Sequence, residues 1–262
     1  MTVYKYLHSH GLKFLSTLKL KLTSPADVDD PFEMRPQPGS AIVTEEMVGR
    51  LLASPDRMRA FFGLSGHADF DRWVTECQSH RETFRNWLGR ELPGAVKQYC
   101  NQAAEATAKD YRMICFSKSN DNILMWSHYG DKHSGIVVGF DRDALQVALK
   151  ARALDVDCRK ERVVWGSEEF LFPSLHYAEQ FLRRKSLSWA YQEEVRYVVK
   201  RGSDEFVSCP AKLVSSILLG AKFPAAEVPT VQRLMKNSGV RAELLCAFPD
   251  DNEFRLNFRP AP

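Results

Sequence analysis

The chain has 262 residues, of which 44% are hydrophobic and 26% are charged, and its formal net charge is +3. This composition is that of an ordinary globular protein, and so small a net charge gives no support for a nucleic-acid partner. The six cysteines are far apart and form no C-x-x-C pair, which argues against a zinc ribbon or a thioredoxin-like motif.

No apolar stretch approaches the ~20 residues that are needed to cross a bilayer, so we expect no membrane partner. The start of the chain lacks the apolar run of a signal peptide. Widely spaced cysteines without such a signal are typical of a reduced, cytoplasmic protein.

Apolar periodicity and turn residues predict a series of strands and helices. In chain order we expect strand 3–7, helix 11–18, strand 20–23, a break at 36–40, helices between 44 and 112, strand 112–117, helix 120–130, strand 135–140, helix 141–151, strand 163–165, helix 174–184, strand 192–200, strand 214–219, helix 224–237, strand 240–247 and strand 254–258. In the helical region, Pro93 and Gly94 are expected to interrupt a helix.

The order of these elements shows no regular alternation of strand and helix. It predicts an α+β class with a mixed or antiparallel central sheet. Residues 1–262 are expected to form a single domain, with 44–112 as a mainly helical insertion or cap.

The most informative strand is the one expected at 192–200. Successive strand side chains point to opposite faces, so Gln192, Glu194 and Arg196 share one face. Val195 and Tyr197 share the other face and require a core. The polar row is either a salt-bridged surface ladder or the floor of a cleft, because buried charges must be paired or used.

Two other segments leave similar alternatives open. Lys5 alternates with two tyrosines on the first strand, so this strand is either a sheet edge or brings Lys5 to an anion. Trp126, His128 and Tyr129 crowd into about one helical turn, as core aromatics or as the lining of a pocket. His128 and His133 are five apart, but a surface turn is the favoured interpretation over a metal site.

Several motifs resemble domain-of-unknown-function family 2971, a large and mostly bacterial family of uncharacterised proteins. They are, in order, Tyr4-Lys5-Tyr6, Asp29-Asp30-Pro31-Phe32-Glu33, Cys115-Phe116-Ser117, Trp126-Ser127-His128-Tyr129 with Gly135 and Phe140 beyond it, Lys185, Trp189 through Arg196, and Val214 through Gly220. The sequence departs from the family pattern where Asp29 replaces the usual Asn and Gln192 replaces the first Glu.

A further similarity, at the level of the fold, is to mono-ADP-ribosyltransferases. These enzymes have a basic residue on the first strand, a serine on a middle strand and Glu-x-Glu or Gln-x-Glu on a late strand, which resembles Lys5, Ser117 and Gln192-x-Glu194. The similarity implies NAD as a substrate, with Glu194 and Gln192 as catalytic residues. It also implies that NAD is bound by Lys5, Tyr6, Ser117, Trp126, His128, Tyr129 and Arg196.

In this hypothesis Glu194 stabilises the oxocarbenium-like sugar that forms when the nicotinamide–ribose bond breaks, and Gln192 orients the acceptor. The partner would be a small-molecule nucleotide, with a protein or a nucleic acid as a further target. A bacterial toxin or an anti-phage defence effector fits this description.

Two other hypotheses stay open. A metal-dependent nuclease or phosphodiesterase would gather Asp30, Glu33, His128 and Glu194 around a divalent cation. A non-catalytic module of a defence system would use the polar row only to bind a ligand or a partner.

Overall fold

The computed structural model describes residues 1–8, 10–33, 37–38, 43–61, 69–160, 164–165, 179, 182–200 and 205–262. The chain folds as two compact units: unit 1 is Met1–Asp29, Ala108–Lys160 and Lys185–Pro262, and unit 2 is Asp30–Thr107 and Glu161–Arg184. The expectation of a single domain with a helical insertion stays a prediction, because an insertion can itself form a compact unit.

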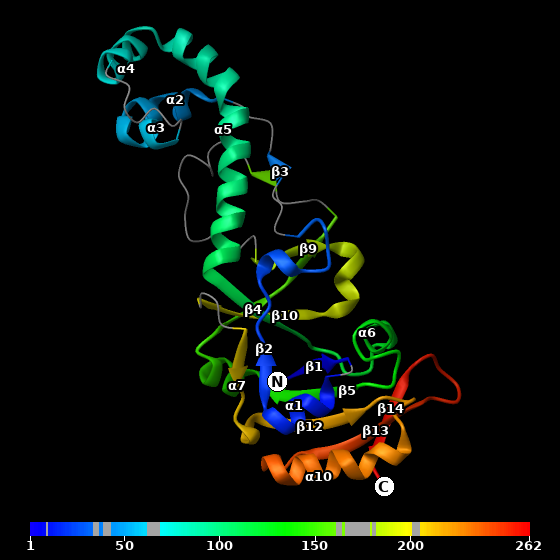
Figure 1. Ribbon diagram of the computed structural model, residues 1–262. Coiled ribbons are helices and arrows are strands. Elements are labelled where there is room, and N and C mark those ends of the chain that lie inside the picture. Colours follow the sequence, from blue (N-terminus) through cyan, green and yellow to red (C-terminus); the bar gives the residue numbers. More distant parts are fainter. Residues whose placement is uncertain are drawn as a thin grey trace. The chain divides into compact units, whose positions relative to one another are not determined.

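Unit 1 is built on an eight-stranded sheet with the order β14-β13-β12-β5-β1-β4-β10-β6 (Figure 1). Its strands are β1 (Thr2–Leu7), β4 (Tyr111–Ser117), β5 (Ile136–Asp141), β6 (Arg152–Asp155), β10 (Glu194–Lys200), β12 (Val214–Leu219), β13 (Glu243–Pro249) and β14 (Leu256–Pro260). Within this sheet β12 and β13 run parallel, and the other neighbours are antiparallel. The predicted α+β class with a mixed sheet is confirmed.

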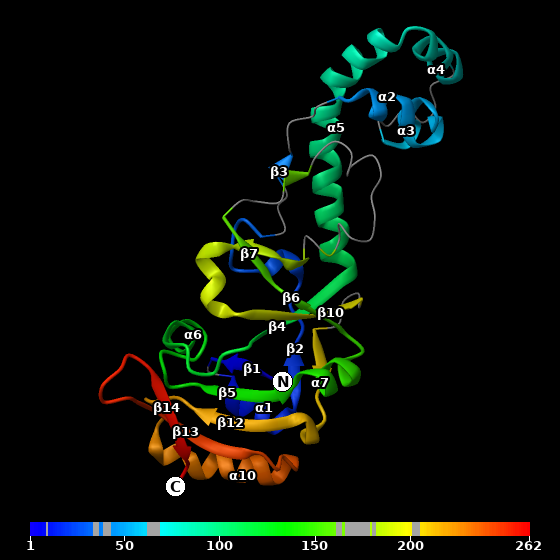
Figure 2. The same cartoon turned by 180° about the vertical axis from the view of Figure 1, so that it is seen from behind.

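Helices cover both faces of this sheet (Figure 2). The helices of unit 1 are α1 (Gly11–Thr17), α6 (Ile123–His128), α7 (Arg142–Leu149) and α10 (Val228–Ser238). Apolar side chains of α1, α7 and α10 pack with Val138 of β5 in one core cluster, whereas Met125 and Trp126 of α6 pack with Val137 in another. Neighbouring residues of β5 therefore serve opposite faces, as strand alternation requires.

Smaller elements complete unit 1. They are the strand pair β2 (Lys19–Lys21) and β11 (Phe206–Ser208), the pair β7 (Asp157–Arg159) and β9 (Arg184–Ser186, of which Arg184 belongs to unit 2), and the 3-10 helices η1 (Pro25–Asp27), η2 (Leu187–Gln192), η3 (Ala211–Leu213) and η4 (Ala225–Glu227). Two of these, η2 and β9, carry residues of the candidate site described below.

Unit 2 is mainly helical. It contains α2 (Glu45–Leu52), α3 (Pro55–Phe61), α4 (Phe70–Ser79), most of α5 (Arg81–Asp110), and the short parallel pair β3 (Gln37–Pro38) and β8 (Val164–Trp165). The helices predicted between 44 and 112 are thus present. On α4, Phe70, Val74 and Cys77 are buried and Trp73 is half-buried, so the i, i+3, i+4, i+7 spacing of these residues marks the inward face of the helix.

The expected interruption at Pro93 is wrong, because α5 continues through it. Proline removes one backbone hydrogen bond and favours a kink. On either side of it, however, Leu88, Leu92 and Val96 are buried. The packing of this apolar stripe stabilises the helix across the defect.

Two other predictions fall mostly on residues that the structure does not describe. The helix expected at 174–184 lies largely outside the described residues. So does most of the break expected at 36–40, whose described residues Gln37–Pro38 form the short strand β3 instead. The described part of the chain has no helix that combines the length and the apolar character needed to cross a membrane.

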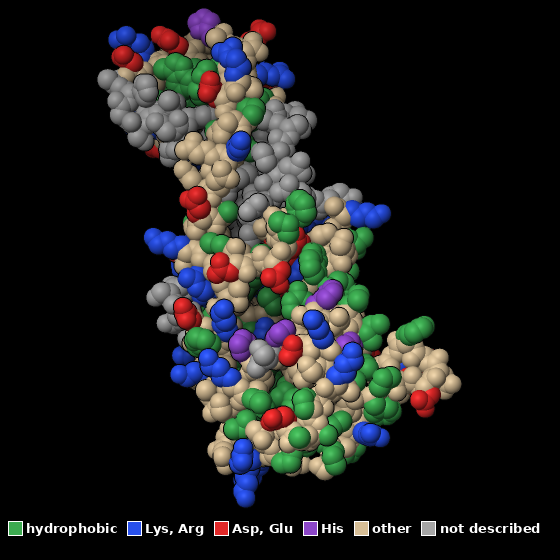
Figure 3. Space-filling model, turned by 45° about the vertical axis from the view of Figure 1, so that its right-hand side comes forward, with side chains coloured by type: hydrophobic (Ala, Val, Ile, Leu, Met, Phe, Trp, Pro, Cys, Tyr) green, Lys and Arg blue, Asp and Glu red, His purple; other side chains and the backbone are tan. Residues whose placement is uncertain are grey.

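Figure 3 shows one face of the molecule in space-filling form. On this face the described basic and acidic side chains are interspersed, and neither sign forms a continuous surface. This distribution agrees with the small net charge of +3.

Candidate functional site

The candidate site is formed where η2 meets β10. Ser186 is the N-cap of η2, and its hydroxyl accepts a hydrogen bond from the backbone N–H of Ser188. Glu193 ends it in the left-handed conformation, with φ of +43°. The strand therefore begins at Glu194, and Gln192, which we had predicted to be part of the strand, belongs to the 3-10 helix.

The strand register decides which side chains share the face of Glu194. Glu194 lies opposite Ser117 of β4, Arg196 lies opposite Cys115, and Ser117 in turn lies opposite Tyr4 of β1. On the other face of β10, Val195, Tyr197 and Val199 are buried in the main core. The predicted separation of the polar and apolar faces of this strand is confirmed.

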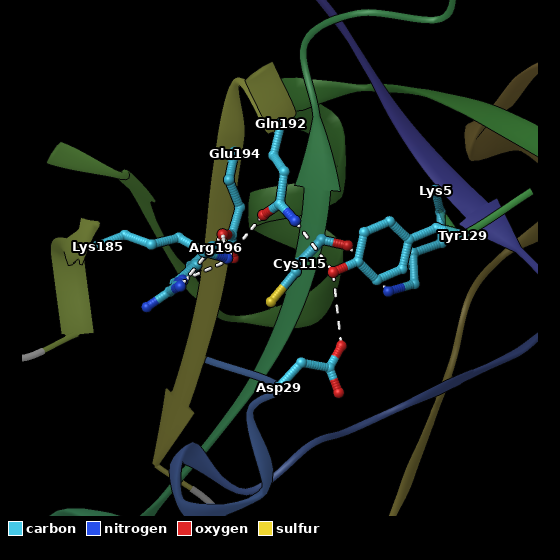
Figure 4. Close-up of polar contacts among 8 residues, drawn as sticks. All are labelled: Lys5, Asp29, Cys115, Tyr129, Lys185, Gln192, Glu194 and Arg196. Atoms are coloured by element: carbon cyan, nitrogen blue, oxygen red, sulfur yellow. Dashed lines mark hydrogen bonds and ion pairs between the residues drawn. The ribbon is translucent and has the colours of Figure 1, made fainter. Parts of the chain in front are cut away.

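A continuous polar network occupies the polar face (Figure 4). Arg196 donates to both carboxylate oxygens of Glu194, with Nε 2.7 Å from Oε1 and Nη2 3.1 Å from Oε2. The Lys185 ammonium, on β9, lies 2.7 Å from Glu194 Oε2 and 2.6 Å from Gln192 Oε1. One carboxylate is thus held by two cations, and one of these cations also holds the neighbouring amide.

Burial gives these contacts their electrostatic weight. The side chain of Arg196 is 0% exposed and that of Glu194 is 5% exposed. Burial alone would raise the pKa of Glu194, but the charges and hydrogen bonds of Arg196, with the charge of Lys185, lower it to about 2. Glu194 is therefore ionised at neutral pH, and the row is not an exposed ladder.

The network continues outward from Gln192 to the surface. The Gln192 amide nitrogen donates to the Tyr129 hydroxyl at 3.0 Å. That hydroxyl lies 3.5 Å from a carboxylate oxygen of the exposed Asp29, a long hydrogen bond. Burial raises the pKa of Tyr129 to about 12, against the lowering effect of Lys185, so Tyr129 is a hydroxyl donor at neutral pH.

Lys5 lies on a central strand, since β1 has β5 on one side and β4 on the other. The edge-strand alternative is therefore wrong. The two strands β1 and β4 pair at Tyr4 and Ser117, and further along β4 Thr23 takes the place of β1 opposite Met113. Between these two pairings the Lys5 ammonium donates to the backbone carbonyl of Cys115 at 2.9 Å.

Burial lowers the pKa of Lys5, while the nearby Cys115 and Glu194 act in the opposite direction. For the Cys115 thiol, burial has the opposite effect: it raises the pKa to about 12, and the charge of Glu194 raises it further. The thiol is therefore protonated at neutral pH and is a poor nucleophile. In this structure Lys5 donates to a backbone carbonyl, and the alternative of an anion beside Lys5 stays a prediction.

Two predicted ligand-binding rings are engaged in packing. Trp126 is 0% exposed, and its indole N–H donates to the carbonyl of Asn120 at 2.7 Å. The Tyr6 ring packs against it edge-on, with centroids 5.5 Å apart, and its hydroxyl donates to the carbonyl of Ser119. Ser117 is buried too, and its hydroxyl accepts from the backbone N–H of Ser119.

Accessible rings lie beside the network instead. The Nδ1 atom of the exposed His128 lies 3.0 Å from the hydroxyl oxygen of Tyr191. The ring centroids of Tyr191 and Trp189 are 6.0 Å apart, and the Lys185 ammonium is 5.4 Å from the centroid of Trp189. Asn122, the N-cap of α6, fastens this part of η2 by donating to the backbone carbonyl of Tyr191.

The structure thus joins four residues of the predicted set in one network: Gln192, Glu194, Arg196 and Tyr129. Ser117, on the neighbouring strand β4, lies on the same face of the sheet, and Lys5 lies one strand further along, on β1. Sequence reasoning did not assign Lys185 or Asp29 to the site. In the sequence, Lys185 stands out only as part of a family motif. Strand alternation does not predict its contact with Gln192, because Lys185 lies on a separate short strand, β9.

The residues of the metal hypothesis divide between the units: Asp30 and Glu33 belong to unit 2, whereas His128 and Glu194 belong to unit 1. Among the described residues, no group of three or more His, Cys, Asp or Glu side chains has the arrangement to hold a metal ion.

Comparison with known proteins gives one match. A family model described as a protein of unknown function (DUF2971) matches residues 125–197, roughly a quarter of the chain. The matched segment runs from α6 into β10 and contains Tyr129, Lys185, Gln192, Glu194 and Arg196, so it supports the family resemblance where the network lies. Searches of curated proteins and of solved structures found no match.

Proposed function

We propose that unit 1 binds NAD and transfers its ADP-ribosyl group, with Glu194 as the catalytic carboxylate. The observation that carries this proposal is that Glu194 is buried, ionised and linked to the surface through Lys185, Gln192 and Tyr129. When the nicotinamide–ribose bond breaks, positive charge develops on the sugar, and a fixed carboxylate that is shielded from water stabilises it.

The contacts change the roles that we assign to some of the predicted residues. Arg196 holds both oxygens of Glu194 and so fixes its orientation, and Lys5 serves the Cys115 carbonyl. Because Trp126 is fully buried, we assign the stacking of a nicotinamide or adenine ring to Tyr191 and Trp189. The role of toxin or defence effector stays a prediction.

The test is NAD binding by calorimetry and nicotinamide release by chromatography. Measurements use the wild type, the variant Glu194→Gln, and the control Glu243→Gln, which makes the same change at an exposed residue of β13. Water serves as one acceptor, and total cell protein and total RNA as others. We expect Glu194→Gln to bind NAD but to lose at least ~100-fold in nicotinamide release, the size of effect seen when one stabilising group is removed.

Two results would contradict the proposal. One is a wild type that neither binds NAD nor releases nicotinamide with any of these acceptors. The other is a Glu194→Gln variant that turns over NAD as fast as the Glu243→Gln control.

One observation favours a second candidate, a binding module without turnover. Both oxygens of Glu194 are already held by Arg196 and Lys185, as in a network whose purpose is to keep its own geometry. In that case the wild type binds a nucleotide without releasing nicotinamide, and Glu194→Gln weakens binding or folding.

A further inference from the structure

The contacts of Lys185 include an amide oxygen and a carboxylate oxygen. Its ammonium lies 2.6 Å from Gln192 Oε1 and 2.7 Å from Glu194 Oε2, and its side chain is 10% exposed. An ammonium group has hydrogen-bond donors and no acceptor. It therefore requires an oxygen from each of its partners, and this requirement fixes the orientation of the Gln192 amide.

The fixed amide sets the direction of the remaining hydrogen bonds. With its oxygen toward Lys185, Gln192 points its NH2 group at the Tyr129 hydroxyl oxygen, 3.0 Å away. Tyr129 accepts that hydrogen bond, so its own proton points away from Gln192, toward Asp29. Without a donor-only group at residue 185, the amide can turn over, and the Tyr129 proton can then point inward.

The outer end of this chain is available to a ligand. The Tyr129–Asp29 hydrogen bond is long, at 3.5 Å, and Asp29 is exposed. A long hydrogen bond of this kind is weak and readily exchanged. A ligand oxygen that accepts a hydrogen bond, such as a phosphate or carboxamide oxygen, can take the place of the carboxylate.

We propose that Lys185 is the positioning residue of this site. It orients the Gln192 amide so that Tyr129 presents its hydroxyl proton outward, to an acceptor oxygen of the ligand. For NAD as the ligand this inference rests on the proposed function, but the orientation of the amide can be measured without any ligand.

The first measurement is hydrogen exchange of the Gln192 side-chain NH2 by NMR, assigned from the signal that disappears in Gln192→Glu. Lys185→Met and Lys185→Gln both remove the donor-only group, and Lys13→Met is the control at an exposed residue of α1. We expect both Lys185 variants to exchange at least about tenfold faster, the effect of losing roughly one hydrogen bond. The control and the backbone amides of β10 should exchange as in the wild type.

The second measurement is the rate of nicotinamide release. In Lys185→Met and Lys185→Gln we expect kcat to fall at least about tenfold and KM to change less than about threefold, because positioning is lost. Lys185→Arg keeps a donor-only group at residue 185 and should restore part of kcat.

The outcomes separate the two proposals. If Gln192 exchange is unchanged in both Lys185→Met and Lys185→Gln, the positioning role is wrong, whatever the protein does with NAD. If exchange rises as expected but the wild type neither binds nor turns over NAD, the proposed function fails and the positioning role stands. Faster exchange throughout β10 in both variants would also overturn the inference, because it would show general loosening of the fold.

Discussion

The substitution Glu194→Gln tests whether the buried carboxylate contributes to stability in the way its surroundings predict. Folding lowers the pKa of Glu194 from 4.5 to about 2. At ~1.4 kcal/mol for each pKa unit, the ionised form adds about 3 kcal/mol to the free energy of unfolding. Because the pKa of the folded state is the lower one, this contribution is complete above about pH 4.5 and is lost as the pH falls toward about 2.

Urea unfolding followed by circular dichroism at pH 7 and pH 3 measures this effect. At pH 7 we expect Glu194→Gln to be less stable than the wild type by about 3 kcal/mol, since it removes the negative charge to which both Arg196 and Lys185 are paired. At pH 3 the wild type has lost about 2 kcal/mol of this contribution, so the difference narrows by that amount.

The control for this comparison is Glu243→Gln, whose stability should follow the wild type at both pH values. If the gap between Glu194→Gln and the wild type is the same at pH 7 and pH 3, the carboxylate is not held ionised by its neighbours, and the electrostatic account of the site is wrong.

Three further changes test other parts of unit 1. Gly11→Ala brings a new Cβ to within 2.7 Å of Ile136 Cβ, where α1 crosses β5, and should cost about 1–3 kcal/mol in the free energy of unfolding. Tyr129→Phe removes the acceptor of the Gln192 amide and should cost about 1–3 kcal/mol on the same measurement. Cys115 should resist iodoacetamide at pH 8 in the native protein and react once the protein is unfolded, as peptide mass spectrometry can show.

The two substitutions have matched comparisons. Gly89→Ala, in α5, meets no atom within 4 Å and should raise stability by up to ~1 kcal/mol through helix propensity. Tyr111→Phe alters a half-buried tyrosine outside the network and should cost less than ~0.5 kcal/mol. Equal losses at both members of either pair, or rapid native modification of Cys115, would contradict the corresponding prediction.

The sequence predicted the parts of this fold that depend on local pattern. The alternation of Val195 and Tyr197 with polar residues was enough to separate the two faces of β10, because burial acts on every second residue of a strand. The helix expected at 120–130 contains α6, which is shorter because Asn122 caps it at Ile123.

What the sequence did not predict depends on contacts between distant segments. An edge strand was one alternative for Lys5, yet Lys5 lies on a central strand and donates to a carbonyl on β4 at the point where β1 and Thr23 exchange places. No local pattern reports such an exchange of partners. Pro93 was misjudged for a related reason, since the packing that stabilises α5 across it comes from the helix's tertiary surroundings.

The left-handed residue Glu193 has a consequence for how the site could be copied or altered. In an uninterrupted strand, residues two apart stand about 7 Å from each other and run side by side. The turn at Glu193 breaks that spacing, so that the Gln192 amide and the Glu194 carboxylate converge on one ammonium, at 2.6 and 2.7 Å. A Gln-x-Glu sequence placed on a regular strand would therefore not recreate the site. The site requires the left-handed backbone at residue 193 as well as the two side chains.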